Sequence, residues 1–163
     1  MGKHFKWFYL CISISLCWVP VAHAQRQVIG WLEMVAVNNS RHPVEAKIDT
    51  GADNSSLNAV NQKIFERDDQ PWVKFNLVTR SGKIIDFEKP IIKKTRIKMK
   101  DGKTQMRNVI EIDVCIGTVK KKIQVNLVDR SHFKYQMLIG RSFLINDFLV
   151  DSAETFTMKP ACL

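Results

Sequence analysis

The sequence predicts an all-β domain, a closed β-barrel with one short helix near its C-terminus. The 163 residues suffice for one domain or at most two, and a chain that is 45% apolar and 25% charged has ordinary globular composition. The apolar runs are short, are separated by turn residues and lack helical period. Only residues 141–146, which follow Gly140, favour a short helix.

The strands are predicted from runs of apolar or alternating residues bounded by turns. Asn38-Asn39-Ser40 marks one turn, and Asp101-Gly102, after an alternating run, is the strongest hairpin signal in the chain. The tail after Lys159 is expected to be loose. The predicted strands span residues 28–37, 44–48, 72–78, 84–87, 95–100, 109–114 and 123–127.

The first 24 residues have the pattern of a secretory signal peptide. Two lysines and a histidine open the chain, residues 7–19 are uncharged and apolar, and Ala22-His23-Ala24 is a small-x-small cleavage signal. An uncleaved anchor is the alternative, but a membrane span needs about 20 apolar residues. We therefore expect residues 25–163 to form a single periplasmic or secreted domain with no membrane span after cleavage.

Charge and cysteine content narrow the partners and the chemistry. The formal net charge is +9, and removing residues 1–24 takes away two lysines and no acids, which leaves +7 and favours anionic partners. Cys115 and Cys162 remain after cleavage. Export makes a disulfide chemically possible, but two cysteines, one of them in a tail, are not a disulfide framework. Two unpaired thiols are the favoured interpretation.

Two separated segments carry the candidate chemistry. Asp49-Thr50-Gly51, followed by Ala52, comes directly after the apolar run Ala46-Lys47-Ile48. An aspartate held there can activate water, and the glycine permits a tight turn; a strand-to-turn junction with an Asx-type turn is the structural alternative. Roughly ninety residues later, Met137-Leu138-Ile139-Gly140-Arg141 opens the predicted helix.

This pair of segments in an all-β chain resembles one subunit of a retropepsin-like aspartic protease. Further runs resemble a bacterial retropepsin-like aspartic endopeptidase family that is often labelled ATP-dependent zinc protease, and the resemblance covers residues 28–157. The matching runs are Val28–Glu33, Ala46–Ala52, Ser56–Ala59, Leu127–Arg130, Met137–Arg141 and Phe148–Asp151.

The resemblance implies a closed barrel like a retropepsin monomer, with Asp49 as the catalytic residue. It implies that the hairpin around Asp101-Gly102 is a flap over the substrate. The implied supporting residues are Thr50, Gly51, Ala52, Leu138, Ile139 and Gly140, and the implied flap residues are Lys100, Asp101 and Gly102.

The sequence departs from the family at two positions. Asp53 stands where members usually carry arginine, and Asn58 stands where they usually carry histidine. A second carboxylate four residues from Asp49 is expected to raise the catalytic pKa or to repel acidic substrates.

One Asp-Thr-Gly triplet implies two chains. Aspartic proteases use two carboxylates that share one proton, so we expect a homodimer with Asp49 from each protomer on a two-fold axis. Asp151 is the internal competitor, but Ala153 replaces the glycine of a true triplet, which favours a carboxylate at a strand end.

The sequence gives no support for cofactors or nucleic acid. It lacks His-Glu-x-x-His, Cys-x-x-Cys and a glycine-rich loop followed by Lys-Ser or Lys-Thr, so neither zinc nor ATP is expected. No Ser or Cys triad is indicated. Residues 93–107 are strongly basic, but no aromatic side chains interleave the lysines and arginines, and export makes nucleic acid an unsuitable partner.

The basic hairpin leaves two interpretations open. Strand alternation puts Lys94, Arg96, Lys98 and Lys100 on one face. This face either is a solvated edge protected from aggregation or attracts acidic peptides. The function predicted overall is an exported aspartic endopeptidase acting on peptide or protein substrates, which are acidic if the basic face attracts them. The alternative is a non-catalytic periplasmic binding module with the same barrel.

Overall fold

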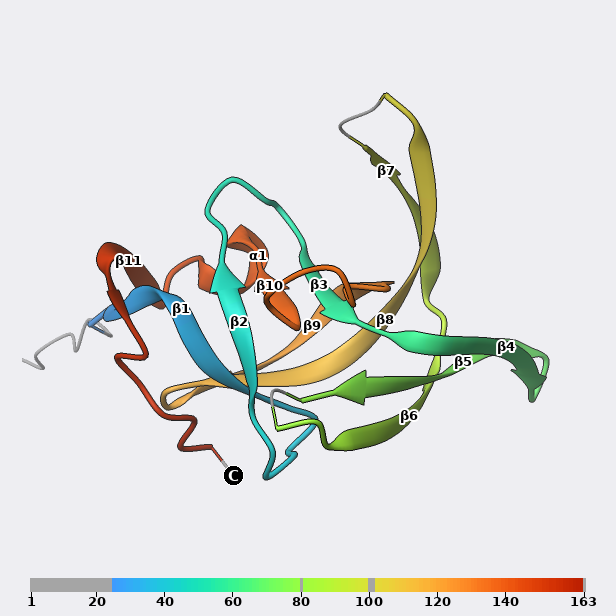
Figure 1. The fold of residues 1–163 in the computed structure, drawn as a ribbon, viewed down its shortest axis with the longest axis horizontal. Coiled ribbons are helices and arrows are strands. Elements are labelled where there is room, and N and C mark those ends of the chain that lie inside the picture. Colours follow the sequence, from blue (N-terminus) through green and yellow to red (C-terminus); the bar gives the residue numbers. More distant parts are fainter. Residues whose placement is uncertain (1–24, 80, 100–101, 163) are drawn as a thin grey trace, which may run out of the picture.

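The structure, a computed structural model, describes residues 25–79, 81–99 and 102–162 (Figure 1). The predicted signal peptide lies outside these residues. In the described part no helix has the length and apolarity needed to cross a membrane. The elements are β1 Gln27–Val37, β2 Val44–Ile48, β3 Ser55–Asn58, β4 Val60–Arg67, β5 Gln70–Val78, β6 Ile84–Pro90, β7 Lys93–Lys98, β8 Thr104–Ile116, β9 Val119–Val128, β10 Met137–Ile139, α1 Arg141–Leu144 and β11 Phe148–Thr155.

The larger sheet is mixed and curls into a ring. Its order is β11-β1-β2-β10-β3-β9-β8-β7, and β1 pairs in addition with β8 through Ala36–Cys115 and Val37–Val114. The short β10 lies between β2 and β3, parallel to the first and antiparallel to the second. The all-β class and the short helix are confirmed, and a ring-like mixed sheet stands where the sequence predicted a closed barrel.

The apolar core is formed by the buried residues of this ring together with α1 and the buried face of the second sheet. Apolar residues of β1, β8 and β9 are buried, and β2 buries all its residues except Lys47. Phe143 of α1 is completely buried and stacks on Phe148, with ring centroids 5.7 Å apart. Burying one such ring contributes about 1.5–3 kcal/mol, so a helix of only four residues is held by its side chains.

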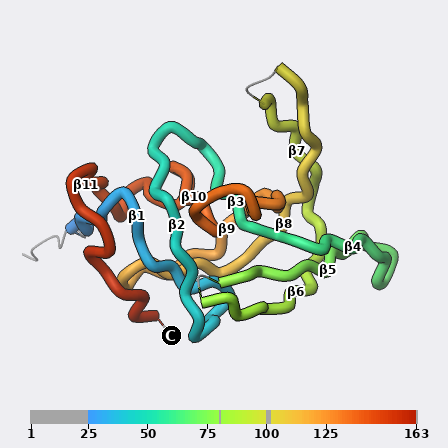
Figure 2. Tube along the Cα trace, in the orientation of Figure 1, coloured from blue at the N-terminus to red at the C-terminus, as the bar shows by residue number. Residues whose placement is uncertain are grey.

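A second sheet extends to one side of the ring (Figure 2). It is antiparallel in the order β4-β5-β6. Phe75 and Phe87 pair across β5 and β6 and stack in its buried face, 5.2 Å apart. On its outer part the Arg67 guanidinium lies over the Trp72 ring, 4.4 Å from the centroid, and pairs with Glu88.

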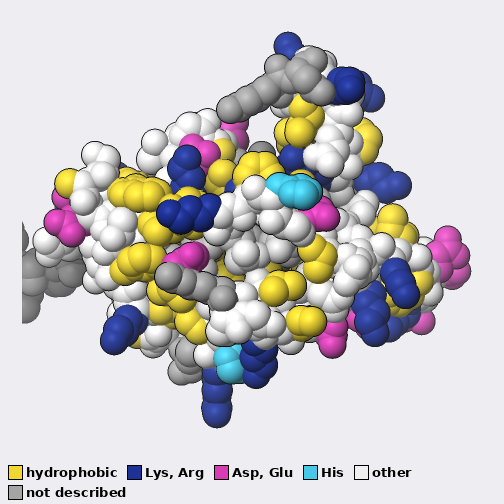
Figure 3. Space-filling model, viewed as in Figure 1, with side chains coloured by type: hydrophobic (Ala, Val, Ile, Leu, Met, Phe, Trp, Pro, Cys, Tyr) yellow, Lys and Arg dark blue, Asp and Glu magenta, His cyan; other side chains and the backbone are white. Residues whose placement is uncertain are grey.

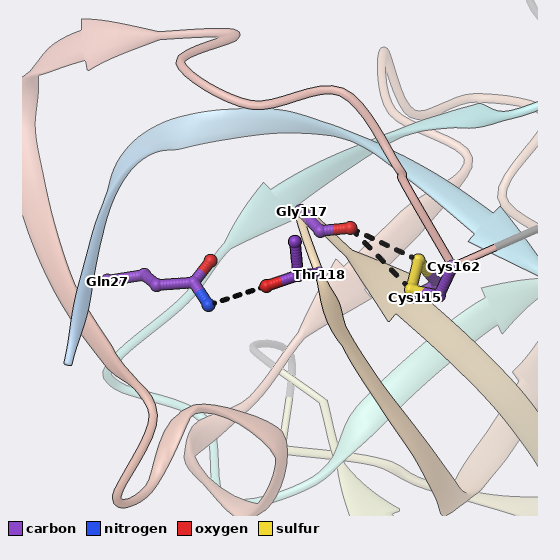
Figure 4. Close-up of a disulfide and its surroundings, with 5 residues drawn as sticks. All are labelled: Gln27, Cys115, Gly117, Thr118 and Cys162. Carbon is purple, nitrogen blue, oxygen red and sulfur yellow. Dashed lines mark hydrogen bonds between the residues drawn. A yellow bond between two sulfur atoms is a disulfide. The ribbon is translucent and has the colours of Figure 1, made fainter. Parts of the chain in front are cut away.

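The C-terminal tail is anchored, which overturns two expectations. Cys115 and Cys162 form a disulfide with Cα atoms 6.2 Å apart (Figure 4), so the interpretation of two unpaired thiols is wrong. The tail after Lys159 is not loose either, because Ala161 N–H donates to the Gly117 carbonyl at 2.7 Å. The buried Glu33 carboxylate holds the preceding turn by accepting bonds from backbone N–H groups of the tail.

Candidate active site

Asp49 directly follows β2, and backbone hydrogen bonds fix its position. Its N–H donates to the Ile139 carbonyl of β10 at 2.9 Å. Its carboxylate accepts a bond from the Gly51 N–H at 3.0 Å, and its carbonyl accepts one from the Ala52 N–H at 3.2 Å. The side chain is half-buried, so the carboxylate is held in one orientation and stays accessible to a substrate.

The second predicted segment packs against this loop. Leu138 and Ile139 of β10 pair with the end of β2, which brings the junction at Gly140 next to the loop. Arg141 N–H donates to the Ala52 carbonyl at 2.9 Å. A Cβ on Gly140 would lie 2.7 Å from backbone atoms of Asn54. The two segments that the sequence assigns to one site therefore lie in direct backbone contact.

Asp53 is paired rather than free. It is exposed, and its carboxylate forms an ion pair with the guanidinium of Arg141. The same guanidinium donates to the Thr50 carbonyl at 2.8 Å, and Thr50 itself is exposed. Arg141 thus ties together both ends of the loop and offsets the negative charge that the sequence expected beside Asp49.

A buried arginine that sequence reasoning missed lies near the catalytic candidate. Arg130 is only 8% exposed, and its guanidinium donates to Ser56 Oγ at 3.0 Å and to the Tyr135 carbonyl at 3.1 Å. Burial lowers the pKa of Arg130, the Arg107 charge lowers it further, and the Asp49 carboxylate raises it. Arg130 therefore places a positive charge within electrostatic reach of Asp49.

Asn58, the residue in place of the family histidine, has a structural role here. It is buried, and its amide oxygen accepts the Arg130 N–H at 2.8 Å. Its amide nitrogen donates to Gln136 at 2.6 Å. The signal available in the sequence for this cluster was one arginine two residues after the apolar end of β9 at Val128.

The predicted flap is the β7–β8 hairpin, which stands out from the body of the molecule (Figures 1 and 3). Its turn is confirmed, because Gly102 has φ of 80° and its N–H donates to the Met99 carbonyl at 3.0 Å. Lys100 and Asp101 lie outside the described residues. A small pocket lies under the hairpin and is lined by Asn54, Lys93, Thr95, Ile97, Val109, Gln124 and Asn126.

The two faces of the hairpin differ in charge and direction. Thr95 and Ile97 line the pocket, so the alternating Lys94, Arg96 and Lys98 are on the opposite face, and all three are exposed. The predicted basic face therefore exists, but it points away from the pocket.

Asp151 does not form a second triplet. It lies inside β11, paired with Gly30, and its carboxylate accepts a local hydrogen bond from the Ala153 N–H at 2.8 Å. β1 separates β11 from β2 in the sheet. Among the described residues, no three His, Cys, Asp or Glu side chains are grouped so that they could hold a metal ion.

Comparison with known proteins defines the class that this loop and fold represent. A family model described as retropepsin-like aspartic endopeptidase RimB matches residues 28–161. The chain therefore belongs to the RimB-like family of retropepsin-like aspartic endopeptidases.

The curated relatives are named as ligases and not as endopeptidases, and they are much longer than this chain. Two proteins named probable alpha-L-glutamate ligase, from Shewanella pealeana and Shewanella halifaxensis, are 35% and 36% identical over 118 residues, which is 71% of this chain. The chain spans about a quarter (26%) of the length of each. A crystal structure of the Legionella pneumophila protein Lpg0085, of unknown function, is 32% identical with a TM-score of 0.71, covering 83% of this chain and all of that one.

Proposed function

We propose that this chain is an exported aspartic endopeptidase that works as a homodimer. The observation that supports it best is Asp49, half-buried and fixed by the Gly51 N–H at the point where β10 meets the loop. In the dimer one Asp49 carboxylate takes a proton from water while its partner, protonated, donates to the peptide carbonyl. The ring of strands then corresponds to the closed barrel of a retropepsin subunit.

An apolar groove beside the loop supports the second copy as the missing half of the site. Ile145 and Leu149 are 64% and 50% exposed in it. It adjoins Thr50, and β11, which contributes its far wall, is an edge strand of the sheet. Contact here would bring two Asp49 loops together and cover the apolar surface. The groove is lined by Arg26, Thr50, Arg141, Leu144, Ile145, Asn146, Phe148, Leu149 and Val150.

We propose acidic, glutamate-containing peptides as the substrates. Arg130 adds positive charge beside Asp49, and Lys93 lines the pocket under the hairpin. The relatives named alpha-L-glutamate ligase contain a segment similar to this chain, and a protease domain joined to such a ligase would meet glutamyl bonds.

Export is the remaining part of the proposal. The pattern of residues 1–24 supports it, and so does the Cys115–Cys162 disulfide, because disulfides persist in oxidising compartments. Mass spectrometry of the protein from the cell envelope should find Gln25 at the N-terminus; an intact Met1 there would contradict the proposal.

Cleavage of a peptide library by wild-type and Asp49→Asn protein tests the catalytic proposal. The substitution is nearly isosteric, so the circular dichroism spectrum should be unchanged. Cleavage should fall by about 10²–10⁴-fold, the contribution typical of general acid–base catalysis. Asp151→Asn is the matched control and should keep activity. Full activity in folded Asp49→Asn protein would refute the aspartic mechanism.

The same assay separates the dimer and the binding-module hypotheses. Specific activity should fall on dilution, because dissociation removes one of the two carboxylates, and zinc chelators should have no effect. Constant activity in a proven monomer would exclude the homodimer. Peptide binding without cleavage under any pH would favour the non-catalytic binding module.

A further inference from the structure

We propose that Arg107, on the inner face of the hairpin, is a specificity-determining residue that binds the carboxylate of an acidic substrate side chain beside Asp49. The inference rests on the proposed function, since it gives the site its substrate preference. It assigns that preference to one side chain and not to the more conspicuous basic face of β7.

The strand register places Arg107 on the side of the hairpin that faces the pocket. Arg107 is opposite Thr95 in the β7–β8 ladder, and directly opposed residues project from the same face of an antiparallel pair. Thr95 lines the pocket. Arg96, opposite Met106 on the other face, is exposed to solvent.

A relay of hydrogen bonds connects Arg107 to Gly140, at the junction beside the loop of the catalytic candidate. Its Nη1 donates to Asn126 Oδ1 at 2.9 Å, and the Asn126 amide in turn donates to the Ser55 carbonyl at 2.8 Å. Ser55 Oγ accepts the Gly140 N–H at 3.1 Å. Two residues, Asn126 and Ser55, therefore link Arg107 to the junction that packs against the Asp49 loop.

Arg107 still has donors to offer. Its Nε donates to Gln105 at 2.8 Å, and its Nη2 has only the thioether of Met99, a weak acceptor, at 3.9 Å. Among the described residues no carboxylate forms an ion pair with it. Partial burial lowers the pKa of Arg107, as expected for a cation taken out of water without a counter-charge.

A carboxylate is the anion that this arrangement suits. A planar guanidinium can offer two parallel N–H donors to a carboxylate, and such charge-assisted pairs are stronger and more directional than neutral hydrogen bonds. Arg130 lies close enough to Arg107 for the Arg107 charge to lower the Arg130 pKa. Lys93 lines the wall of the pocket. A glutamate side chain entering under the hairpin would neutralise this excess of positive charge.

Peptide binding to catalytically inactive protein tests the proposal without depending on cleavage. Calorimetry would compare a hexaglutamyl peptide with its hexaglutaminyl analogue, using full-length mature protein that carries Asp49→Asn. Adding Arg107→Gln should weaken binding of the glutamyl peptide by about 10–100-fold, the range of a charged hydrogen-bond pair, and leave glutaminyl binding unchanged. Arg107→Lys should fall between, because it keeps the charge and loses the fork.

Arg96→Gln is the matched control, because it removes the same charge from the opposite face of the same hairpin. Glutamyl affinity should stay within about twofold of the parent protein, since exposed charges are strongly screened. Equal losses for Arg96→Gln and Arg107→Gln, or no preference for glutamyl over glutaminyl peptide, would overturn the inference. Unchanged circular dichroism shows that each variant is folded.

The outcomes separate this inference from the proposed function. Selective glutamyl binding that requires Arg107, with no cleavage by protein that retains Asp49, would uphold the inference and reject the protease. Cleavage of both peptides at equal rates, unaffected by Arg107→Gln, would uphold the protease and reject the inference.

Discussion

Replacing Gly140 by alanine should destabilise the protein through one steric contact. Gly140 has φ of −93° and ψ of 175°, which alanine adopts without strain. The added Cβ would nevertheless lie 2.7 Å from the carbonyl carbon and oxygen of Asn54 and 2.9 Å from the carbonyl carbon of Asp53. Backbone atoms at this distance must move, and ordinary contacts lie at about 3.5–4.0 Å.

The cost follows from what must move. Overpacking of this kind costs about 1–3 kcal/mol, and the shift weakens bonds that join the two segments, including Arg141 N–H to the Ala52 carbonyl at 2.9 Å. Each such bond contributes about 0.5–1.5 kcal/mol. Alanine restores about 0.4–1 kcal/mol by restricting the unfolded chain. We therefore expect a net loss of about 0.5–4 kcal/mol.

Urea unfolding followed by circular dichroism measures this loss. With a slope of about 2 kcal/mol/M, the midpoint of Gly140→Ala should fall by about 0.3–2 M, and peptide cleavage should fall because the Asp49 loop is displaced. Gly82→Ala is the control for removing a glycine without a steric contact: its Cβ meets nothing within 4 Å, so its cost is the backbone strain of about 1–2 kcal/mol at φ of +78°. A Gly140→Ala midpoint equal to that of wild type would refute the close packing of loop and junction.

Three further predictions concern stability. Cys162→Ser should lower the free energy of unfolding by about 4 kcal/mol, from loop-closure entropy over the 47-residue separation from Cys115, measured by urea titration under oxidising conditions. Glu33→Gln should cost about 2 kcal/mol in the same titration, because the amide turns a donor toward the N–H groups that the buried carboxylate accepts. The Arg67 hydrogen bond lowers the pKa of Glu88, so the pair stabilises the folded protein at neutral pH and this effect is lost as the pH falls through the lowered pKa. The difference in unfolding free energy between Glu88→Gln and wild type should therefore disappear in acid.

The sequence predicted the strands in which apolar residues are buried and polar residues are exposed. Every predicted strand is present, and β2 ends at Ile48 as expected. β3 was missed because Ser55, Ser56 and Asn58 are polar, and polar residues predict exposure. All three are buried because each finds a hydrogen-bond partner from a distant segment, and those partners exist only once the sheet has formed.

The candidate site, like the strands, was predicted only where the type of a residue reveals its position in the fold. Local sequence and family resemblance located Asp49 and Gly140, since a tight turn and a close backbone approach require particular residues. The roles proposed for Arg107 and Arg130 depend on strand register and on side-chain burial, which the residue types alone do not give. The sequence therefore showed Arg107 only as one of the basic residues of a hairpin, and it gave no sign of a role for Arg130. The anchoring of Cys162 was missed for the same reason, because it depends on the path of a tail that pairs with β1.

Asp53 acts differently from the second carboxylate that the sequence suggests. Its side chain is 76% exposed and pairs with Arg141, which also bonds the Thr50 carbonyl. Water screens an exposed pair, so the pair adds little to stability, but it leaves the loop close to neutral on that side. Arg130 is buried, and its charge interacts with the Asp49 carboxylate, which raises the Arg130 pKa. The ion pair with Arg141 therefore offsets the Asp53 charge, which removes the basis for the repulsion of acidic substrates that the sequence predicts.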